Sequence, residues 1–160
     1  MQDRYAEFRK LAIDLNVDAI GLVPGSNFDR LFGQSFGTNE RPMLVVIPRT
    51  GTPAALFPNL ELPSVALLNF EGEVFDWYDE RGYDGAFQSL AQSLPLASIA
   101  VEGQSMRVFV QQAITKAWKG IRVLDAEHAI SGLRSRKTEK ELSLMATVAA
   151  LSEKALAETP

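Results

Sequence analysis

The fold is decided by the stretch Met43-Leu-Val-Val-Ile47, which the turn Arg49-Thr-Gly-Thr52 returns into Ala54-Ala-Leu-Phe57. A continuous apolar run of this length is typical of a strand that is covered on both faces. The polar turn between the two runs contains glycine, which favours antiparallel pairing of the segments on either side. We therefore expect a hairpin inside a buried sheet.

Helical and strand-like segments alternate on both sides of this hairpin. Upstream, residues 5–15 carry apolar side chains at helical spacing, and Asn16 ends that pattern before the apolar run 19–23. Downstream, the sequence predicts strands at 74–78, 98–101 and 121–124, and helices at 83–94 and 106–118. This alternation predicts an α/β fold, a three-layer α/β/α sandwich, and the hairpin makes its sheet mixed.

The last helix begins at a capping box, in which Thr138 and Glu141 can each satisfy a backbone N–H of the first turn. Half of its circumference is apolar. That half carries Leu142, Leu144, Met145, Val148, Ala149, Leu151, Ala155 and Leu156. Such a surface needs a cover, and only Thr159 and Pro160 follow, so we expect the helix to lead into a part that these 160 residues do not contain.

The composition favours one globular domain, with 46% apolar residues and a net charge of −4. A negative net charge does not favour binding to a nucleic acid or an anionic membrane. No apolar run approaches the length of a membrane span. The first ten residues lack the apolar core of a signal peptide. The chain has no cysteine, which excludes disulfides and thiolate chemistry, and we expect a cytoplasmic protein.

Four short motifs are spread over nearly the whole chain. They are Pro24-Gly25-Ser26-Asn27-Phe28 with Leu31 and Gly33; Glu40-Arg41-Pro42; Phe57-Pro58-Asn59-Leu60-Glu61; and a junction pattern of Leu133, Arg134, Lys137, Glu141, Leu142 and Met145. Together they resemble the N-terminal part of the creatinase/prolidase/Xaa-Pro aminopeptidase family, the pita-bread metallopeptidases. Arg30 and Phe32 depart from the family pattern, which usually has Tyr and Thr there.

The resemblance implies a ribonuclease-H-like N-terminal domain over residues 1–132. It also implies that residues 133–160 are the junction and first helix leading towards a missing catalytic domain. The parent protein is then a homodimeric metallopeptidase with two divalent metal ions, acting on short proline-containing peptides. This chain is its non-catalytic domain, which helps to shape one wall of the substrate site; the alternative is a stand-alone binding or dimerisation module.

Within this resemblance, Arg41 is a candidate substrate contact. A guanidinium suits a peptide carboxylate because its planar fork can bind both oxygens. The alternative is that Arg41 pairs with Glu40 or with another surface acid.

Asn27, Arg30 and Phe32 are further candidates for substrate contact. They follow the first strand, at its carboxyl end, where open α/β sheets place ligands. The alternative is that these residues only cap and pack the following helix, with Ser26 or Asn27 as the N-cap and Phe32 in the core.

No catalytic metal ligands are recognisable in the chain. Its single histidine, His128, lies in a stretch typical of a surface or capping position. The acidic residues Asp76, Asp79, Glu80 and Asp84 lack the spacing of an EF-hand loop, and a solvated turn is the simpler interpretation.

A serine hydrolase is the remaining alternative. Gly33-Gln-Ser-Phe-Gly37 matches the nucleophile-elbow pattern around Ser35, and Asp125 and His128 follow in the order found in α/β-hydrolases. The elbow requires a strand before the serine and a helix after it. The neighbouring sequence favours neither, and residues 38–42 read as a loop.

Overall fold

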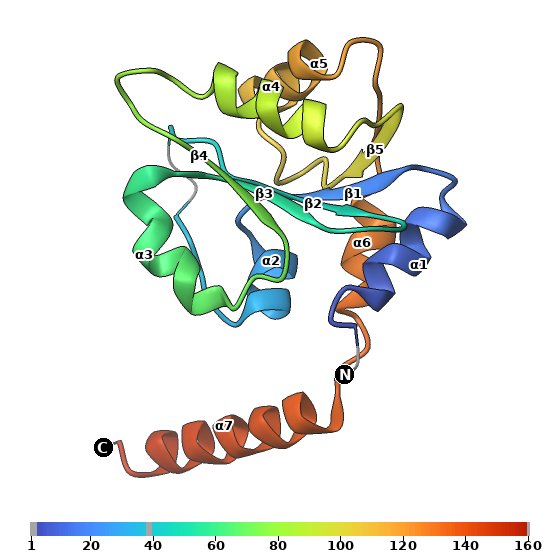
Figure 1. The fold of residues 1–160 in the computed structure, drawn as a ribbon. Coiled ribbons are helices and arrows are strands. Elements are labelled where there is room, and N and C mark those ends of the chain that lie inside the picture. The colour runs from blue at the N-terminus through green and yellow to red at the C-terminus, as the bar shows by residue number, and fades with distance from the viewer. Residues whose placement is uncertain (1–2, 38–39, 160) are drawn as a thin grey trace.

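A six-stranded sheet forms the middle layer of the computed structural model, which describes residues 3–37 and 40–159 (Figure 1). The strands are β1 (Ala19–Leu22), β2 (Leu44–Pro48), β3 (Ala54–Pro58), β4 (Glu73–Trp77), β5 (Ser98–Val101) and β6 (Arg122–Asp125). Their order across the sheet is β4-β3-β2-β1-β5-β6. The predicted antiparallel pairing of the two central segments is confirmed, with Leu44 opposite Leu56.

All strands except β2 run in the same direction. β2 is antiparallel to β1 and β3, whereas β1 and β5, β3 and β4, and β5 and β6 pair in parallel. The carboxyl ends of these five strands and the start of β2 therefore lie along one side of the sheet, which we call the carboxyl edge. This mixed sheet confirms the predicted fold class.

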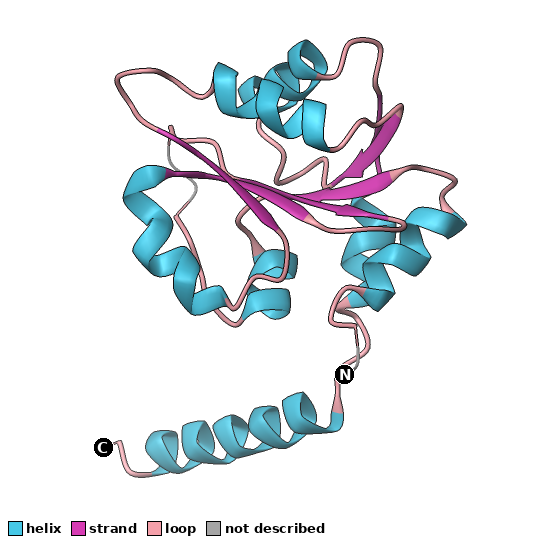
Figure 2. Ribbon diagram, in the orientation of Figure 1, coloured by secondary structure: helices cyan, strands magenta, loops and turns pink. Residues whose placement is uncertain are grey.

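Helices cover both faces of the sheet (Figure 2). One face is covered by α4 (Asp84–Ser93) and α5 (Val108–Ala117). The other is covered by α1 (Ala6–Asp14), α2 (Ser26–Phe32), α3 (Leu62–Val65) and α6 (Glu127–Leu133). α3 and the 3-10 turns that flank it at 59–61 and 66–68 are helical structure that the sequence analysis did not predict. No described helix is both long enough and apolar enough to cross a lipid bilayer.

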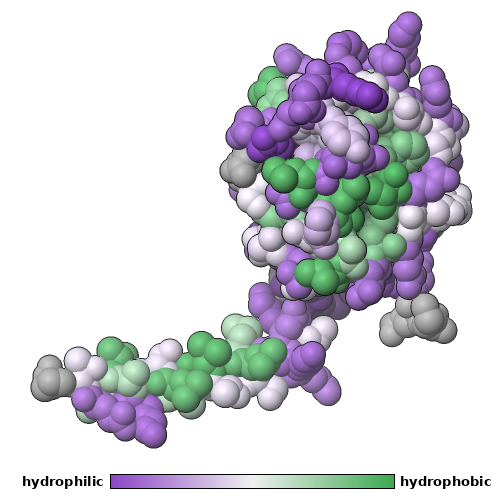
Figure 3. Space-filling model, turned by 60° about the vertical axis from the view of Figure 1, so that its left-hand side comes forward, coloured by the Kyte–Doolittle hydropathy of each residue, from purple (hydrophilic) through white to green (hydrophobic). Residues whose placement is uncertain are grey.

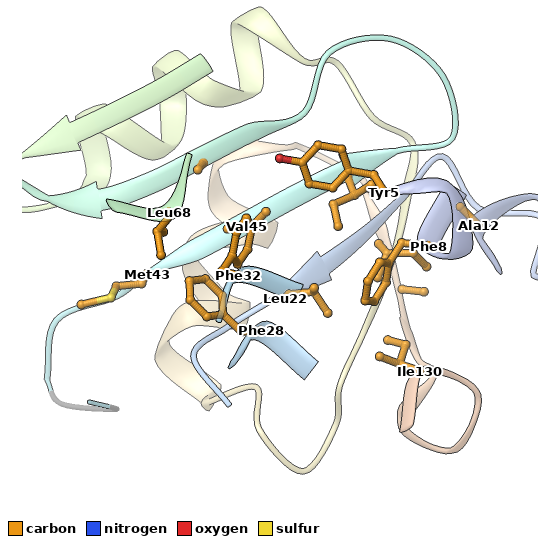
Figure 4. Packing of buried hydrophobic residues seen from close by; sticks show 14 of the residues in the cluster. Tyr5, Phe8, Ala12, Leu22, Phe28, Phe32, Met43, Val45, Leu68 and Ile130 are labelled. Carbon is orange, nitrogen blue, oxygen red and sulfur yellow. The ribbon is translucent and has the colours of Figure 1, made fainter. Parts of the chain in front are cut away.

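Two apolar clusters, one on each face of the sheet, form the core. The first contains Phe28 and Phe32 from α2, packed with side chains of α1 and β2 (Figure 4). The second contains Phe87 of α4 and Ile114 of α5. β2 and β3 are buried along their whole length because both of their faces are covered, as the continuous apolar runs predict.

The two outer strands are more exposed than the central ones. β4 presents Glu73, Val74 and Asp76 to solvent, and β6 presents Arg122 and Asp125. Charged side chains on an outer strand discourage a second sheet from pairing with it.

The last helix, α7 (Glu139–Ala157), extends away from the sandwich (Figure 1). Its predicted capping box is confirmed: the Glu141 N–H donates to the Thr138 hydroxyl at 3.2 Å, and the Thr138 N–H donates to the Glu141 carboxylate at 2.7 Å. No residue of α7 is buried. Figure 3 shows apolar side chains gathered along it, and the exposed fraction of its large apolar side chains runs from 54% at Leu142 to 77% at Leu156.

Candidate functional site

Polar side chains from distant parts of the chain gather at the carboxyl edge. Arg41 lies just before β2, Asp79 follows β4, and Glu102 follows β5 directly. Asn27 lies in the first turn of α2, which follows β1. Parallel strands place the residues that follow them at the same edge, so this clustering is a consequence of the strand order.

Arg41 donates hydrogen bonds to two carboxylates, two of its nitrogens to Asp79 and one to Glu40. Its Nε and Nη2 donate to Asp79, at 3.0 Å to Oδ1 and 2.6 Å to Oδ2. Its Nη1 donates to Glu40 Oε1 at 3.2 Å. The hydrogen bonds between them raise the pKa of Arg41 and lower the pKa of Asp79, so both groups are charged at neutral pH. The predicted ion pair of Arg41 with surface acids is thus present.

Arg41 opens onto a small cleft of about 210 Å³ between the ends of β3 and β4. The lining residues are Arg41, Pro58, Asn59, Leu60, Trp77, Tyr78, Asp79 and Glu80. Trp77 is buried, and its Nε1 donates to the Pro42 carbonyl at 3.3 Å, which ties the floor of the cleft to the segment before β2. Leu60 and Tyr78 are exposed. A cation beside exposed apolar side chains can hold a ligand that carries a carboxylate and an apolar group.

A second polar group at this edge is buried. Asn27 Nδ2 donates to Glu102 Oε1 at 2.7 Å, and both residues are 2% exposed. The other carboxylate oxygen of Glu102 has no hydrogen-bond partner among the described residues. Burial raises the pKa of Glu102, against the opposing effect of the Asn27 hydrogen bond. Glu102 was not predicted from the sequence; its one signal was an acidic residue directly after the apolar residues Ile99-Ala-Val101 of a short strand.

The expectation that Ser26 or Asn27 caps α2 is wrong. Gly25 occupies the N-cap position, and no side chain caps the helix. The Asn27 amide is instead bonded to Glu102, 75 residues away. Phe32, as expected in the alternative interpretation, is buried, with its ring centroid 4.7 Å from that of Phe28.

Arg30 contacts residues of α1, α6 and α7 near the start of α7. Its Nη1 donates to the Leu133 carbonyl at 2.9 Å, and its guanidinium lies 3.4 Å from the Glu141 carboxylate and 3.5 Å from that of Glu7. Asn27 and Arg30 both line a pocket of about 530 Å³ there, which Leu144 of α7 also lines. The structure therefore brings these two candidates together and places Arg41 at a different cleft.

The serine-hydrolase arrangement does not match the structure. A helix, α2, precedes Ser35 where the elbow requires a strand, and Ser35 Oγ donates to Asp29 at 2.7 Å. Asp125 accepts from the backbone N–H groups of Gly103 and Glu127. Two residues of the expected loop, at 38 and 39, lie outside the described residues.

The acidic residues near β4 make contacts of their own. Asp76 accepts from Asn59 at 2.8 Å, Asp79 pairs with Arg41, and Asp84 pairs with Lys116. Within residues 3–37 and 40–159, no three His, Asp or Glu side chains are grouped so that they could hold a metal ion.

Comparison with known proteins gives a family match over most of the chain. The model of the Creatinase/Prolidase N-terminal domain matches residues 4–136. A probable dipeptidase, PepE, from Mycobacterium tuberculosis is 29% identical over 163 residues, covering 98% of this chain and 43% of its own length. An uncharacterized peptidase from Staphylococcus epidermidis is 24% identical over 151 residues, covering 94% of this chain and 41% of its own.

Solved structures show the same fold. A prolidase from Thermococcus sibiricus superimposes with a TM-score of 0.84 at 23% identity, over 98% of this chain and 43% of that one. The chain thus spans about two fifths of the length of each of these three relatives.

Proposed function

The chain belongs to the Creatinase/Prolidase N-terminal domain family, and on that premise we propose that it is the non-catalytic N-terminal domain of a metallopeptidase of the Xaa-Pro aminopeptidase or prolidase type. Its role there is to form one wall of the substrate site, with Arg41 facing the bound peptide. The two metal ions that the resemblance implies have no ligand set among the described residues, so we assign no step of the reaction to this chain.

The arrangement of Arg41 is the observation that supports this proposal. Its guanidinium lies at the rim of a cleft with exposed apolar neighbours, and part of its hydrogen-bonding capacity is met only by the exposed Glu40. A short peptide that ends in proline offers the matching chemistry, because its terminal carboxylate is next to an apolar ring. Substrate contact by Asn27, Arg30 and Phe32 stays a prediction, since the contacts described for their side chains are internal to the chain.

Two partners belong to the same proposal. One is a C-terminal catalytic domain, and the other is a second copy of the protein, in a cytoplasmic homodimer. The proposal is supported by α7, whose large apolar side chains are all exposed and need a cover. The same observation favours a second candidate function, a dimerisation module in which the second copy alone covers that helix.

Replacement of Arg41 in the full-length protein tests the proposed substrate role. We expect Arg41→Ala to lower kcat/KM for an Xaa-Pro peptide by about tenfold or more, because a charge-assisted pair with the carboxylate is lost. The thermal midpoint should stay within about 1–2 °C, since an exposed ion pair contributes little to stability.

Arg49→Ala is the matched control. Arg49 is also an arginine in an ion pair, with Asp18, and is somewhat more exposed than Arg41, but it lies at the opposite end of β2. Equal kinetics for the Arg41 variant and the unmodified enzyme would contradict the substrate role and leave Arg41 as a surface ion pair.

A further inference from the structure

We propose that the two carboxylates bonded to Arg41 have opposite roles in binding a substrate carboxylate, an inference that rests on the substrate role of Arg41 proposed above. Asp79 is a positioning residue that fixes the guanidinium in its productive orientation. Glu40 occupies the place that the incoming carboxylate takes, and so competes with it.

Asp79 is placed to act as a rigid anchor. It accepts hydrogen bonds from two nitrogens of the guanidinium, Nε and Nη2. A bidentate contact of this kind fixes the plane of the group as well as its position. Asp79 lies two residues after Trp77, which is buried and in register with Pro58. The backbone of Arg41 is held too, because Arg107 donates to its carbonyl at 3.3 Å.

The contact between Glu40 and Arg41 is easily broken. It makes a single hydrogen bond to Arg41, at 3.2 Å, and its side chain is 78% exposed. An exposed pair of this kind is weak, because water screens the charges and the side chain loses rotational freedom in making it.

The free edge of the guanidinium fits one more carboxylate. A guanidinium has five N–H donors in a fixed fork. Asp79 takes the edge formed by Nε and Nη2, which leaves the edge formed by Nη1 and Nη2. Glu40 touches only Nη1 on that edge. A carboxylate that binds both nitrogens there makes two bonds where Glu40 makes one, and it displaces Glu40.

These roles predict effects of opposite sign for two substitutions that remove the same charge. Coulomb attraction alone would make Asp79→Asn and Glu40→Gln alike, since each removes a negative charge beside Arg41 and favours an anionic ligand. Positioning instead makes Asp79→Asn harmful, because the guanidinium loses its orientation, and Glu40→Gln helpful, because a competitor is lost.

Kinetics of the full-length enzyme test the difference. For a peptide with a free terminal carboxylate, we expect Asp79→Asn to raise KM about fivefold to tenfold, Asp79→Glu to restore part of the loss, and Glu40→Gln to lower KM about twofold to threefold, with kcat nearly constant. The same peptide with an amidated terminus should show none of these changes, because it offers no carboxylate to the free edge.

The outcomes separate the two proposals. If Arg41→Ala has no effect, the substrate role fails and this inference fails with it. If Arg41→Ala raises KM but Asp79→Asn lowers it or leaves it unchanged, the substrate role stands and the positioning role is overturned. An effect of Glu40→Gln in the same direction as Asp79→Asn would overturn the competition.

A second measurement does not depend on catalysis. In the 160-residue chain, nitrogen-15 NMR can follow hydrogen exchange at Arg41 Nε. Asp79→Asn should speed this exchange at least severalfold while Glu40→Gln leaves it unchanged, because only Asp79 bonds Nε. Equal exchange in the two variants would show that Asp79 does not fix the guanidinium.

Discussion

The sandwich and α7 use amphipathic helices in opposite ways. In α5, the apolar side is buried against α4 and the sheet, so Val110, Ala113 and Ile114 have their cover within the chain. In α7, equally apolar side chains such as Leu144 and Leu151 are more than half exposed. An apolar stripe on a helix therefore predicts that this face is covered, but it does not indicate which molecule or domain covers it.

The largest difference between the two regions is expected from a cavity in the core of the sandwich. Phe28→Ala removes a fully buried ring that packs against Phe32, Phe36 and Phe57. We expect it to lower the free energy of unfolding by about 3–5 kcal/mol, measured by urea denaturation with tryptophan fluorescence. Leu156→Ala in α7 is the control and should change that free energy by less than about 0.5 kcal/mol. Similar losses in both variants would mean that α7 shares the stability of the sandwich.

The buried side chain of Glu102 has a smaller effect on the free energy of unfolding, and this effect depends on pH. Because the pKa of Glu102 is raised in the folded state, the folded protein binds more protons than the unfolded one between the two pKa values. Stability therefore falls as pH rises from the unfolded value towards the folded one, and the penalty is complete above it. Asn27, Glu127 and Arg134 are the polar and charged groups that influence this carboxyl.

Glu102→Gln should remove this penalty. At pH 7 we expect the variant to be more stable by about 1 kcal/mol or more, because burial costs a charged carboxylate more than a neutral amide, whose oxygen can still accept from Asn27. Below about pH 4 the two proteins should converge, because both then carry a neutral side chain. Glu153→Gln on the exposed surface is the control, and a Glu102→Gln variant less stable than the parent at pH 7 would show that the carboxylate is better accommodated than its geometry indicates.

The capping box tests α7 alone. Thr138→Ala removes the hydroxyl that accepts from Glu141, and we expect α7 to lose about 1 kcal/mol. Far-ultraviolet circular dichroism should report less helix, while the fluorescence midpoint of the sandwich stays constant. Thr147→Ala, inside the same helix, should not show this loss, and a shift of the fluorescence midpoint would mean that the two regions unfold together.

The smallest effect on the sandwich comes from the apolar side of α7. Leu144→Glu with Leu151→Glu should leave the unfolding of the sandwich unchanged, because these side chains contribute nothing to its core. The double variant should still shift the chain from dimer to monomer, measured by light scattering, because charge disfavours an apolar interface. Thr147→Glu with Lys154→Glu on the polar side is the control. A monomeric unmodified chain would exclude the second copy as the cover.

Much of the fold was predictable because its main signals are local. The runs 43–47 and 54–57 showed buried strands by length and composition, and the capping residues marked the start of α7. The segment 59–68 was missed because its helical turns are too short for a 3.6-residue period to be recognised.

The candidate site was less predictable because its contacts join distant parts of the chain. Asn27 meets Glu102 only because β1 pairs with β5. Arg41 meets Asp79 only because β2 pairs with β3 and β3 pairs with β4, which brings the start of β2 near the end of β4. Neither contact can be predicted from the residues that are near Asn27 or Arg41 in the sequence. The residues near Arg41 in the sequence indicate that it pairs with an acid, either Glu40 or another, but do not identify Asp79.

The charged outer strands have a consequence for handling the protein. Fibrils grow when an unpaired strand of one molecule templates a strand of the next. Glu73 and Asp76 on β4 are exposed and repel the same edge of a neighbouring molecule, and salt screens this repulsion. Buffers of high ionic strength therefore weaken the molecule's own protection against aggregation, while the apolar side of α7 stays open to other chains.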